Sequence, residues 1–137
     1  MRKGMKDPRL TLDRWVVVDL DGDRKPETVW EVSSVTKAHE RTMTQGSKGD
    51  FTAIFIERGG QKHSLESATQ FAMVSMHDAR LDGVLAAADR LRAIADFDGD
   101  GRYEMVCSAN YYEGQSAAVY SYRAGVVRKL VEYGAGV

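Results

Sequence analysis

Two copies of one short acidic pattern, each between two apolar segments, constrain the fold of this chain more than any other feature. Residues 19–27 have the sequence DLDGDRKPE, and residues 96–104 have the sequence DFDGDGRYE. The two copies lie 77 residues apart (96 − 19). Each is entered and left by an apolar, β-prone run, which is RWVVV and TVWEV for the first copy and LRAIA and MVCS for the second. The sequence therefore predicts an internal repeat of strand, acidic loop and strand.

The acidic residues of the second loop are spaced as calcium ligands. Calcium takes six to eight oxygen ligands, mostly carboxylates, backbone carbonyls and waters. Asp96, Asp98, Asp100 and Glu104 occupy loop positions 1, 3, 5 and 9, and the carbonyl of Arg102 at position 7 could add a further oxygen. The glycines at positions 4 and 6 permit the tight curl that brings alternate side chains together.

The first loop repeats this pattern with one difference at position 6. The expected ligands are again three aspartates, a glutamate at position 9 and a backbone carbonyl at position 7: Asp19, Asp21, Asp23, Glu27 and Lys25. At position 6, Arg24 replaces the glycine, and a non-glycine residue in a left-handed conformation costs roughly 1 kcal/mol. Arg24 and Lys25 also bring positive charge to the loop. We therefore expect two calcium ions, with the second loop as the stronger site.

An EF-hand also begins with acidic residues at positions 1, 3 and 5, but it needs a bidentate glutamate at position 12 and flanking helices. Position 12 is Trp30 in the first loop and Cys107 in the second, and the flanking segments are typical of strands. The EF-hand is therefore excluded. Hairpin turns whose aspartates and glycines serve only turn geometry remain the simpler alternative for each loop.

Both loops resemble the calcium loops of FG-GAP (integrin α-type) repeats and the related VCBS repeats, in which Asp-rich hairpin loops of β-propeller blades bind calcium. The resemblance covers about 20 residues around each loop. It implies metal-binding roles for the carboxylates at positions 1, 3, 5 and 9: Asp19, Asp21, Asp23, Glu27, Asp96, Asp98, Asp100 and Glu104. Position 9 is usually aspartate in that family and is glutamate in both copies here.

The fold class that we expect is mainly β, with antiparallel strand pairs related to propeller blades and one short helix. Further strands are predicted at Phe51–Glu57 and Phe71–Met76, and a hairpin at Ser116–Tyr122 and Val126–Glu132. Apolar residues at helical spacing beside three alanines predict the helix within Asp82–Arg92. Residues 1–137 are interpreted as one domain with repeat-like units at about 10–60 and 85–135.

Two blades cannot close a propeller, since such rings have about four blades or more. Three arrangements therefore stay open: a fragment of a longer protein, an assembly of several chains, or a compact β-rich domain that uses the loop without the ring. An open two-blade unit would expose sheet edges and apolar faces. We adopt the compact domain as the working interpretation.

Composition excludes some classes of function. The formal net charge of −1 gives no global field toward nucleic acid, and no apolar run is long enough for a membrane helix. One cysteine cannot form an internal disulfide or a multi-cysteine zinc site. We expect a calcium-stabilised binding or scaffold module without catalytic residues, acting on a protein or glycan partner. Low-affinity calcium sites would place it in the periplasm or outside the cell.

Two alternatives differ in class from this hypothesis. One is a metal-dependent enzyme in which an acidic loop holds a catalytic cation with an open coordination position. The other is an inhibitor or adhesion module that uses a predicted loop at Asn110–Gly114, where Tyr111 and Tyr112 would form the contact surface. Oligomerisation is compatible with all three.

Overall fold

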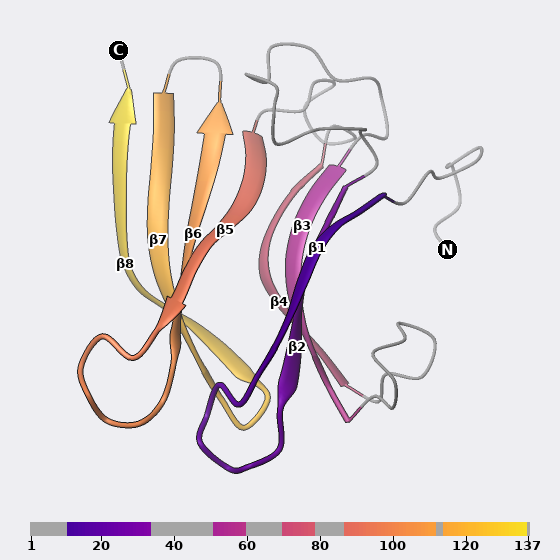
Figure 1. Cartoon of the computed structure of the whole chain (residues 1–137). Helices are drawn as coiled ribbons and strands as arrows, with labels where there is room; N and C mark the ends of the chain where they lie inside the picture. The colour runs from indigo at the N-terminus through magenta and orange to yellow at the C-terminus, as the bar shows by residue number, and fades with distance from the viewer. Residues whose placement is uncertain (1–10, 34–50, 60–69, 79–86, 112–113, 137) are drawn as a thin grey trace.

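The computed structural model describes residues 11–33, 51–59, 70–78, 87–111 and 114–136 of the chain (Figure 1). Every element within these ranges is a strand, and none of the described segments is a helix long and apolar enough to cross a membrane. The eight strands are β1 (Thr11–Val18), β2 (Glu27–Ser33), β3 (Phe51–Arg58), β4 (Gln70–Asp78), β5 (Ala87–Ala95), β6 (Glu104–Tyr111), β7 (Gly114–Arg123) and β8 (Val126–Gly136).

The strands form two four-stranded sheets in which each strand pairs with the next one along the chain. The first sheet has the order β1-β2-β3-β4 and the second has the order β5-β6-β7-β8, and all pairs are antiparallel. The mainly β fold class is therefore confirmed. Each acidic segment connects the first two strands of its sheet, so the internal repeat is one such connection in each sheet. A relation to propeller blades stays a prediction.

The sheets pack face to face, and the core lies between them (Figure 1). Strand β5 lies against β2, β3 and β4 of the first sheet. Alternate residues of each strand enter this core, as the period of two in a strand requires. The buried cluster draws on both sheets: Leu20, Val29, Ile54, Ile56, Val74, Leu91, Met105, Cys107, Ala118, Tyr120 and Tyr122.

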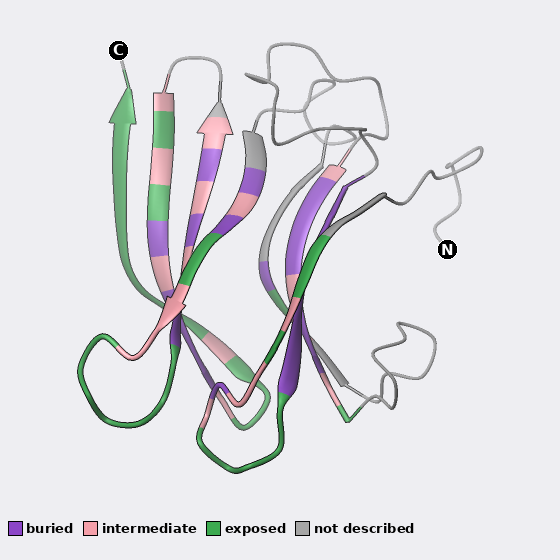
Figure 2. Cartoon of the chain, in the orientation of Figure 1, coloured by how far each residue is buried: buried purple, intermediate pink, exposed green. Residues whose placement is uncertain are grey.

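The opposite face of the first sheet is also apolar. Trp30, Val32 and Ala53 are buried there, and Glu57 accepts a hydrogen bond from Nε1 of Trp30 at 2.7 Å. The ring of Trp15 lies 6.2 Å from that of Trp30, centroid to centroid. Strand β2 is therefore buried along its whole length, whereas β8 is exposed along most of its length (Figure 2).

The predicted helix is wrong for its described part. Residues 87–92 belong to β5, which pairs with β6 from Ala87↔Tyr111 to Ala95↔Glu104. Leu91, which the helical spacing would place on the apolar face of the helix, instead contacts the core from a strand that carries a register shift between Leu91 and Ala93. Tertiary burial outweighs the helix propensity of the alanines. Residues 82–86 lie outside the described part.

The other predicted strands are confirmed, with longer boundaries. The expected hairpin near the end of the chain joins β7 to β8 through Ala124 and Gly125, both at positive φ. The first sheet extends past residue 60 to Asp78 because β4 belongs to it. The loop predicted at Asn110–Gly114 is wrong for Asn110, Tyr111 and Gly114, which lie in paired strands. Tyr112 lies outside the described residues.

Candidate metal centres

The two acidic loops have the same backbone conformation. Positions 4 and 6 have positive φ in both: Gly22 (74°) and Arg24 (68°) in the first, Gly99 (78°) and Gly101 (84°) in the second. The left-handed conformation expected at Arg24 is therefore confirmed. Because this region favours glycine, Arg24 carries a conformational cost that Gly101 avoids.

The aspartate at position 1 organises each loop by accepting three backbone hydrogen bonds. Asp19 accepts from the N–H groups of positions 4, 5 and 6 at 2.9, 3.1 and 2.8 Å. Asp96 accepts the equivalent bonds at 2.7, 3.1 and 2.9 Å. The bond from Gly101 and those from Gly99 and Asp100 hold the pKa of Asp96 below its usual value. These hydrogen bonds stabilise the turn, so turn geometry alone would explain why aspartate stands at position 1 of both loops.

The glutamate at position 9 closes each loop from the start of the following strand. Oε2 of Glu27 accepts from the N–H of Leu20 at 2.9 Å, and Oε2 of Glu104 accepts from the N–H of Phe97 at 3.2 Å. Each glutamate thereby joins two aspartates, with one ligand atom from each residue lying within 4.8 Å of the others. The two triads are Asp19, Asp21 and Glu27 in the first loop, and Asp96, Asp98 and Glu104 in the second.

The aspartate at position 5 lies beside an arginine in both loops. Asp23 is paired with Nη2 of Arg58, whose Nε lies 3.9 Å from Oε1 of Glu27. Nη2 of Arg123 lies 3.8 Å from Oδ2 of Asp100 and 3.1 Å from Oε1 of Glu104. The N–H groups of Lys25 and Arg102 donate to Asp23 and Asp100, respectively, at 2.8 Å each. The triads thus contain three of the four carboxylates expected in each loop, and the two carbonyl ligands stay predictions.

Sequence reasoning missed the two arginines. Arg58 ends β3 and Arg123 ends β7, so each comes from the third strand of its own sheet. They follow their glutamates at different separations along the chain, because the β2–β3 and β6–β7 connections differ in length. No fixed period could therefore have revealed them.

Glu27 is the most unusual group of the two centres. Its side chain is fully buried, and among the described residues its Oε1 atom has no hydrogen-bond partner. Burial raises the pKa of Glu27 from 4.5 to about 7, with Asp21 and Asp23 adding to the rise and the Leu20 N–H and Arg58 opposing it. Its counterpart Glu104 instead accepts a hydrogen bond from Arg123 through Oε1.

Without divalent cations, stability should fall as pH rises from about 4.5 to about 7. A folded-state pKa above the unfolded value means that the folded protein binds the Glu27 proton more tightly than the unfolded chain does. The stabilisation that this proton gives is therefore complete below about pH 4.5 and is lost above about pH 7. A difference of this size corresponds to about 3 kcal/mol. Denaturant unfolding in chelator across this range measures the fall, which Glu27→Gln should remove. The exposed control Glu132→Gln should retain it, and a fall of equal size in Glu27→Gln would contradict the assignment.

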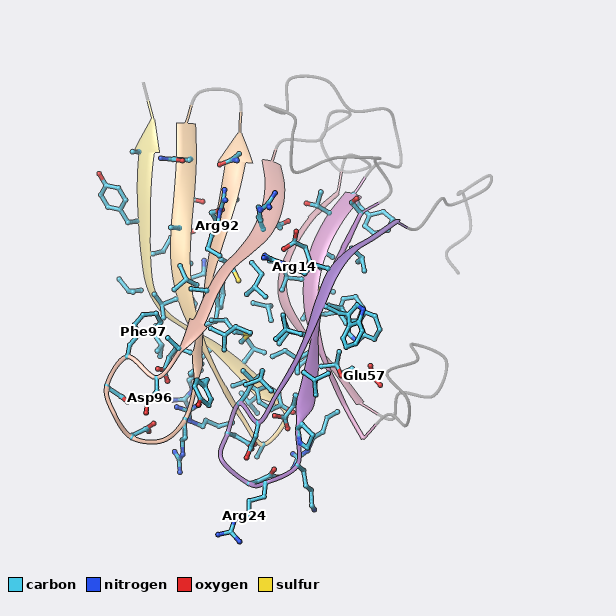
Figure 3. All side chains as sticks on the ribbon, viewed as in Figure 1. Arg14, Arg24, Glu57, Arg92, Asp96 and Phe97 are labelled. Atoms are coloured by element: carbon cyan, nitrogen blue, oxygen red, sulfur yellow. The ribbon has the colours of Figure 1, made fainter. Side chains whose placement is uncertain are left out.

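The two loops differ in their surroundings. Leu20, at position 2 of the first loop, is fully buried between the sheets, and its carbonyl accepts from the N–H of Tyr103 at 2.9 Å. Asp21 accepts from the N–H of Ala124 at 3.1 Å. Phe97, at position 2 of the second loop, is 58% exposed and points away from the first sheet (Figure 3). The first loop is therefore held against Tyr103 of the second loop and against the β7–β8 turn, whereas Phe97 of the second loop is open to solvent.

A scan against family models, a search of curated proteins and a search of solved structures found no match to this chain. Function therefore has to be argued from the residues of the chain itself.

Proposed function

We propose that this chain is a binding or scaffold module stabilised by calcium, with one structural ion in each acidic loop. The main supporting observation is Oε1 of Glu27, which is fully buried beside Asp19 and Asp21 and accepts no hydrogen bond from the described residues. A buried carboxylate oxygen that accepts no hydrogen bond is costly, because nothing compensates for its loss of hydration. A hard cation that prefers oxygen ligands would offset this desolvation cost by binding the oxygen directly.

The donor set fits calcium better than the other common metals. All three residues of each triad offer carboxylate oxygens, and no histidine or cysteine belongs to either triad. Zinc prefers nitrogen and sulfur ligands, and magnesium usually binds through one or two carboxylates and several waters. In the first loop Asp19, Asp21 and Glu27 would hold the ion, and in the second Asp96, Asp98 and Glu104 would do so. The resemblance to FG-GAP and VCBS loops is compatible with this proposal.

The role that we assign to the ion is structural. In the first loop it would neutralise carboxylates at a point where Leu20 and Asp21 also accept hydrogen bonds from the second loop and from the β7–β8 turn. A ligand that binds only the folded state adds about 2.7 kcal/mol at a hundredfold excess over its Kd. If the affinities are those of extracellular modules, about 10⁻⁴–10⁻³ M, the protein works in the periplasm or outside the cell on a protein or glycan partner.

Calcium should therefore raise the thermal midpoint of the chain, and loss of one ligand charge should reduce the rise. Asp98→Asn suits the test because an amide oxygen can still accept the bond that the N–H of Asp100 donates to Oδ1 at 3.1 Å. We expect the midpoint to rise by several degrees between chelator and about 10 mM calcium, since 1 kcal/mol shifts the midpoint of a domain of this size by about 4 °C. Differential scanning calorimetry measures the rise in both proteins.

Three controls make the test specific. Glu132→Gln removes one carboxylate of the same sheet outside the loops and should keep the full rise. Sodium chloride of matched ionic strength should not reproduce the rise, and magnesium should give less of it. An unchanged midpoint in calcium would mean that Arg58 and Arg123 already supply the counter-charges and that the loops are turns.

A further inference from the structure

The cost of the left-handed conformation at Arg24 belongs to the folding of the first loop and not to ion binding. The N–H of Arg24 donates to Asp19 at 2.8 Å, and the N–H of Gly101 donates to Asp96 at 2.9 Å. These hydrogen bonds come from the chain itself and hold both loops in one backbone conformation. A cost that the fold imposes cancels from the difference between bound and free protein. The relative affinity of the two loops is therefore decided by other groups.

The two arginines pair with different carboxylates of their loops. Nη2 of Arg123 donates to Oε1 of Glu104 at 3.1 Å, and Glu104 belongs to the second triad. Arg58 instead donates to Asp23, which lies outside the first triad, and its Nε stays 3.9 Å from Oε1 of Glu27. The triad glutamate of the second loop therefore has a counter-charge at hydrogen-bond distance. Among the described residues, Oε1 of Glu27 has none at that distance.

This difference follows from the register of the third strand in each sheet. The register between β2 and β3 places Arg58 opposite Glu27. In the second sheet Glu104 pairs with Ser121, and Arg123 lies two residues further along β7. The arginines thus occupy different positions relative to two loops of one geometry, and the repeat alone does not make the two centres equal.

An ion in the second loop would have to compete with Arg123 for Glu104. A hydrogen bond between two charged groups is stronger than one between neutral groups, and a cation that takes the same oxygen would weaken or break it. The guanidinium also stays positively charged and repels the ion. In the first loop the buried Oε1 of Glu27 accepts no hydrogen bond from the described residues, so an ion there displaces no donor. Arg58 can keep its bond to Asp23 at the same time.

On the basis of the calcium-binding function proposed above, we propose that the first loop is the tighter calcium site and that Arg123 weakens the second. This order is the reverse of the one that the loop sequences predict. We expect the two Kd values to differ by about tenfold or more, since a hydrogen bond between charged groups contributes enough to change an equilibrium constant by that factor. Arg123 thereby sets the affinity of a site in which it is not a ligand.

The test is calorimetric titration of the 137-residue chain with calcium chloride. We would titrate at pH 8, where the Glu27 carboxyl, whose pKa burial raises to about 7, is ionised in the folded protein. The wild type should give two Kd values about tenfold apart. Glu104→Gln should remove the weaker binding and keep the tighter, and Glu27→Gln should do the reverse. Asp98→Asn, a second variant of the second triad, should act as Glu104→Gln does.

Substitutions of Arg123 test its role. Arg123→Gln removes the positive charge and should lower the Kd of the weaker site by about tenfold, with little change at the tighter site. Arg123→Lys keeps the charge and should retain most of the weakening. Lys129→Gln on β8 removes one exposed positive charge outside the loops and should change neither Kd. Cys107, buried between the sheets, should stay unreactive to thiol reagents in every folded variant.

Three results would overturn the proposal and leave calcium binding itself intact. The first is a pair of equal Kd values in the wild type, and the second is loss of the tighter site in Glu104→Gln or Asp98→Asn. The third is a purely structural role of Arg123, in which Arg123→Gln lowers the thermal midpoint in chelator but leaves both Kd values unchanged. A wild type that binds no calcium at about 10 mM would overturn both this proposal and the proposed function.

Discussion

Ile54→Ala should lower the free energy of unfolding by about 2–5 kcal/mol, the largest loss that we expect from a single truncation. Ile54 is fully buried on β3, an inner strand of the first sheet, and belongs to the cluster that joins the two sheets. Removing its side chain beyond Cβ loses the transfer free energy of three carbons and leaves a cavity that neighbouring strands fill only in part. Urea unfolding followed by tryptophan fluorescence measures the loss as a shift of the midpoint at constant slope.

The matched control for Ile54 is a truncation of an aliphatic side chain outside the core. Leu130 on β8 is 55% exposed, and Leu130→Ala should change the free energy of unfolding by no more than about 0.5 kcal/mol. A loss below about 1 kcal/mol for Ile54→Ala would be incompatible with packing of the sheets through this residue. A loss of equal size in the two variants would be incompatible as well.

Arg14→Ala should cost about 2–4 kcal/mol because it leaves a buried carboxylate without its counter-charge. Glu31 is 4% exposed, and its Oε2 accepts from Nη2 of Arg14 at 3.1 Å and from the N–H of Leu91 at 2.8 Å. Nη2 of Arg14 also donates to the carbonyl of Leu91, so the pair joins β1 and β2 to β5 of the other sheet. The side chain of Arg14 is 42% exposed, which places the expected loss below that of a fully buried pair.

A double-mutant cycle isolates the contribution of this pair. Glu31→Gln keeps an acceptor for the Leu91 N–H but removes the charge, so adding it to Arg14→Ala should recover part of the loss, with a coupling energy of about 1 kcal/mol or more. The exposed pair Lys129–Glu132 is the control, and Lys129→Ala should cost less than about 0.5 kcal/mol. Additive losses in the Arg14 and Glu31 variants would show that the two side chains do not interact.

Much of the local structure could be predicted from the sequence because local interactions determine it. Positive φ at loop positions 4 and 6 follows from the backbone hydrogen bonds that a carboxylate at position 1 accepts, and these join residues at most five apart. Apolar, β-prone runs predicted β3 and the β7–β8 hairpin. The grouping of aspartates with the position 9 glutamate also lies within nine residues of chain. Binding of calcium by these groups stays a prediction.

The prediction of a helix before the second loop failed because it relied on local propensity alone. The alanines favour helix, but Leu91 is buried in the core between the sheets, and a strand allows both this burial and pairing with β6. The arginines beside the loops were missed because local sequence does not specify contacts between strands that lie far apart in the chain. Arg58 and Arg123 reach the carboxylates from the third strand of each sheet, at separations that no sequence period specifies.

By itself, the sequence determined that two acidic loops of one geometry would each connect a pair of strands. Only the tertiary structure gave the two loops different surroundings. Leu20 and Phe97 occupy the same position of the same motif, yet the first is fully buried and the second is 58% exposed. The physical reason is that burial depends on what packs against a side chain. The first sheet has the second sheet against its core face, and the equivalent face of the second sheet has no other described strand packed on it.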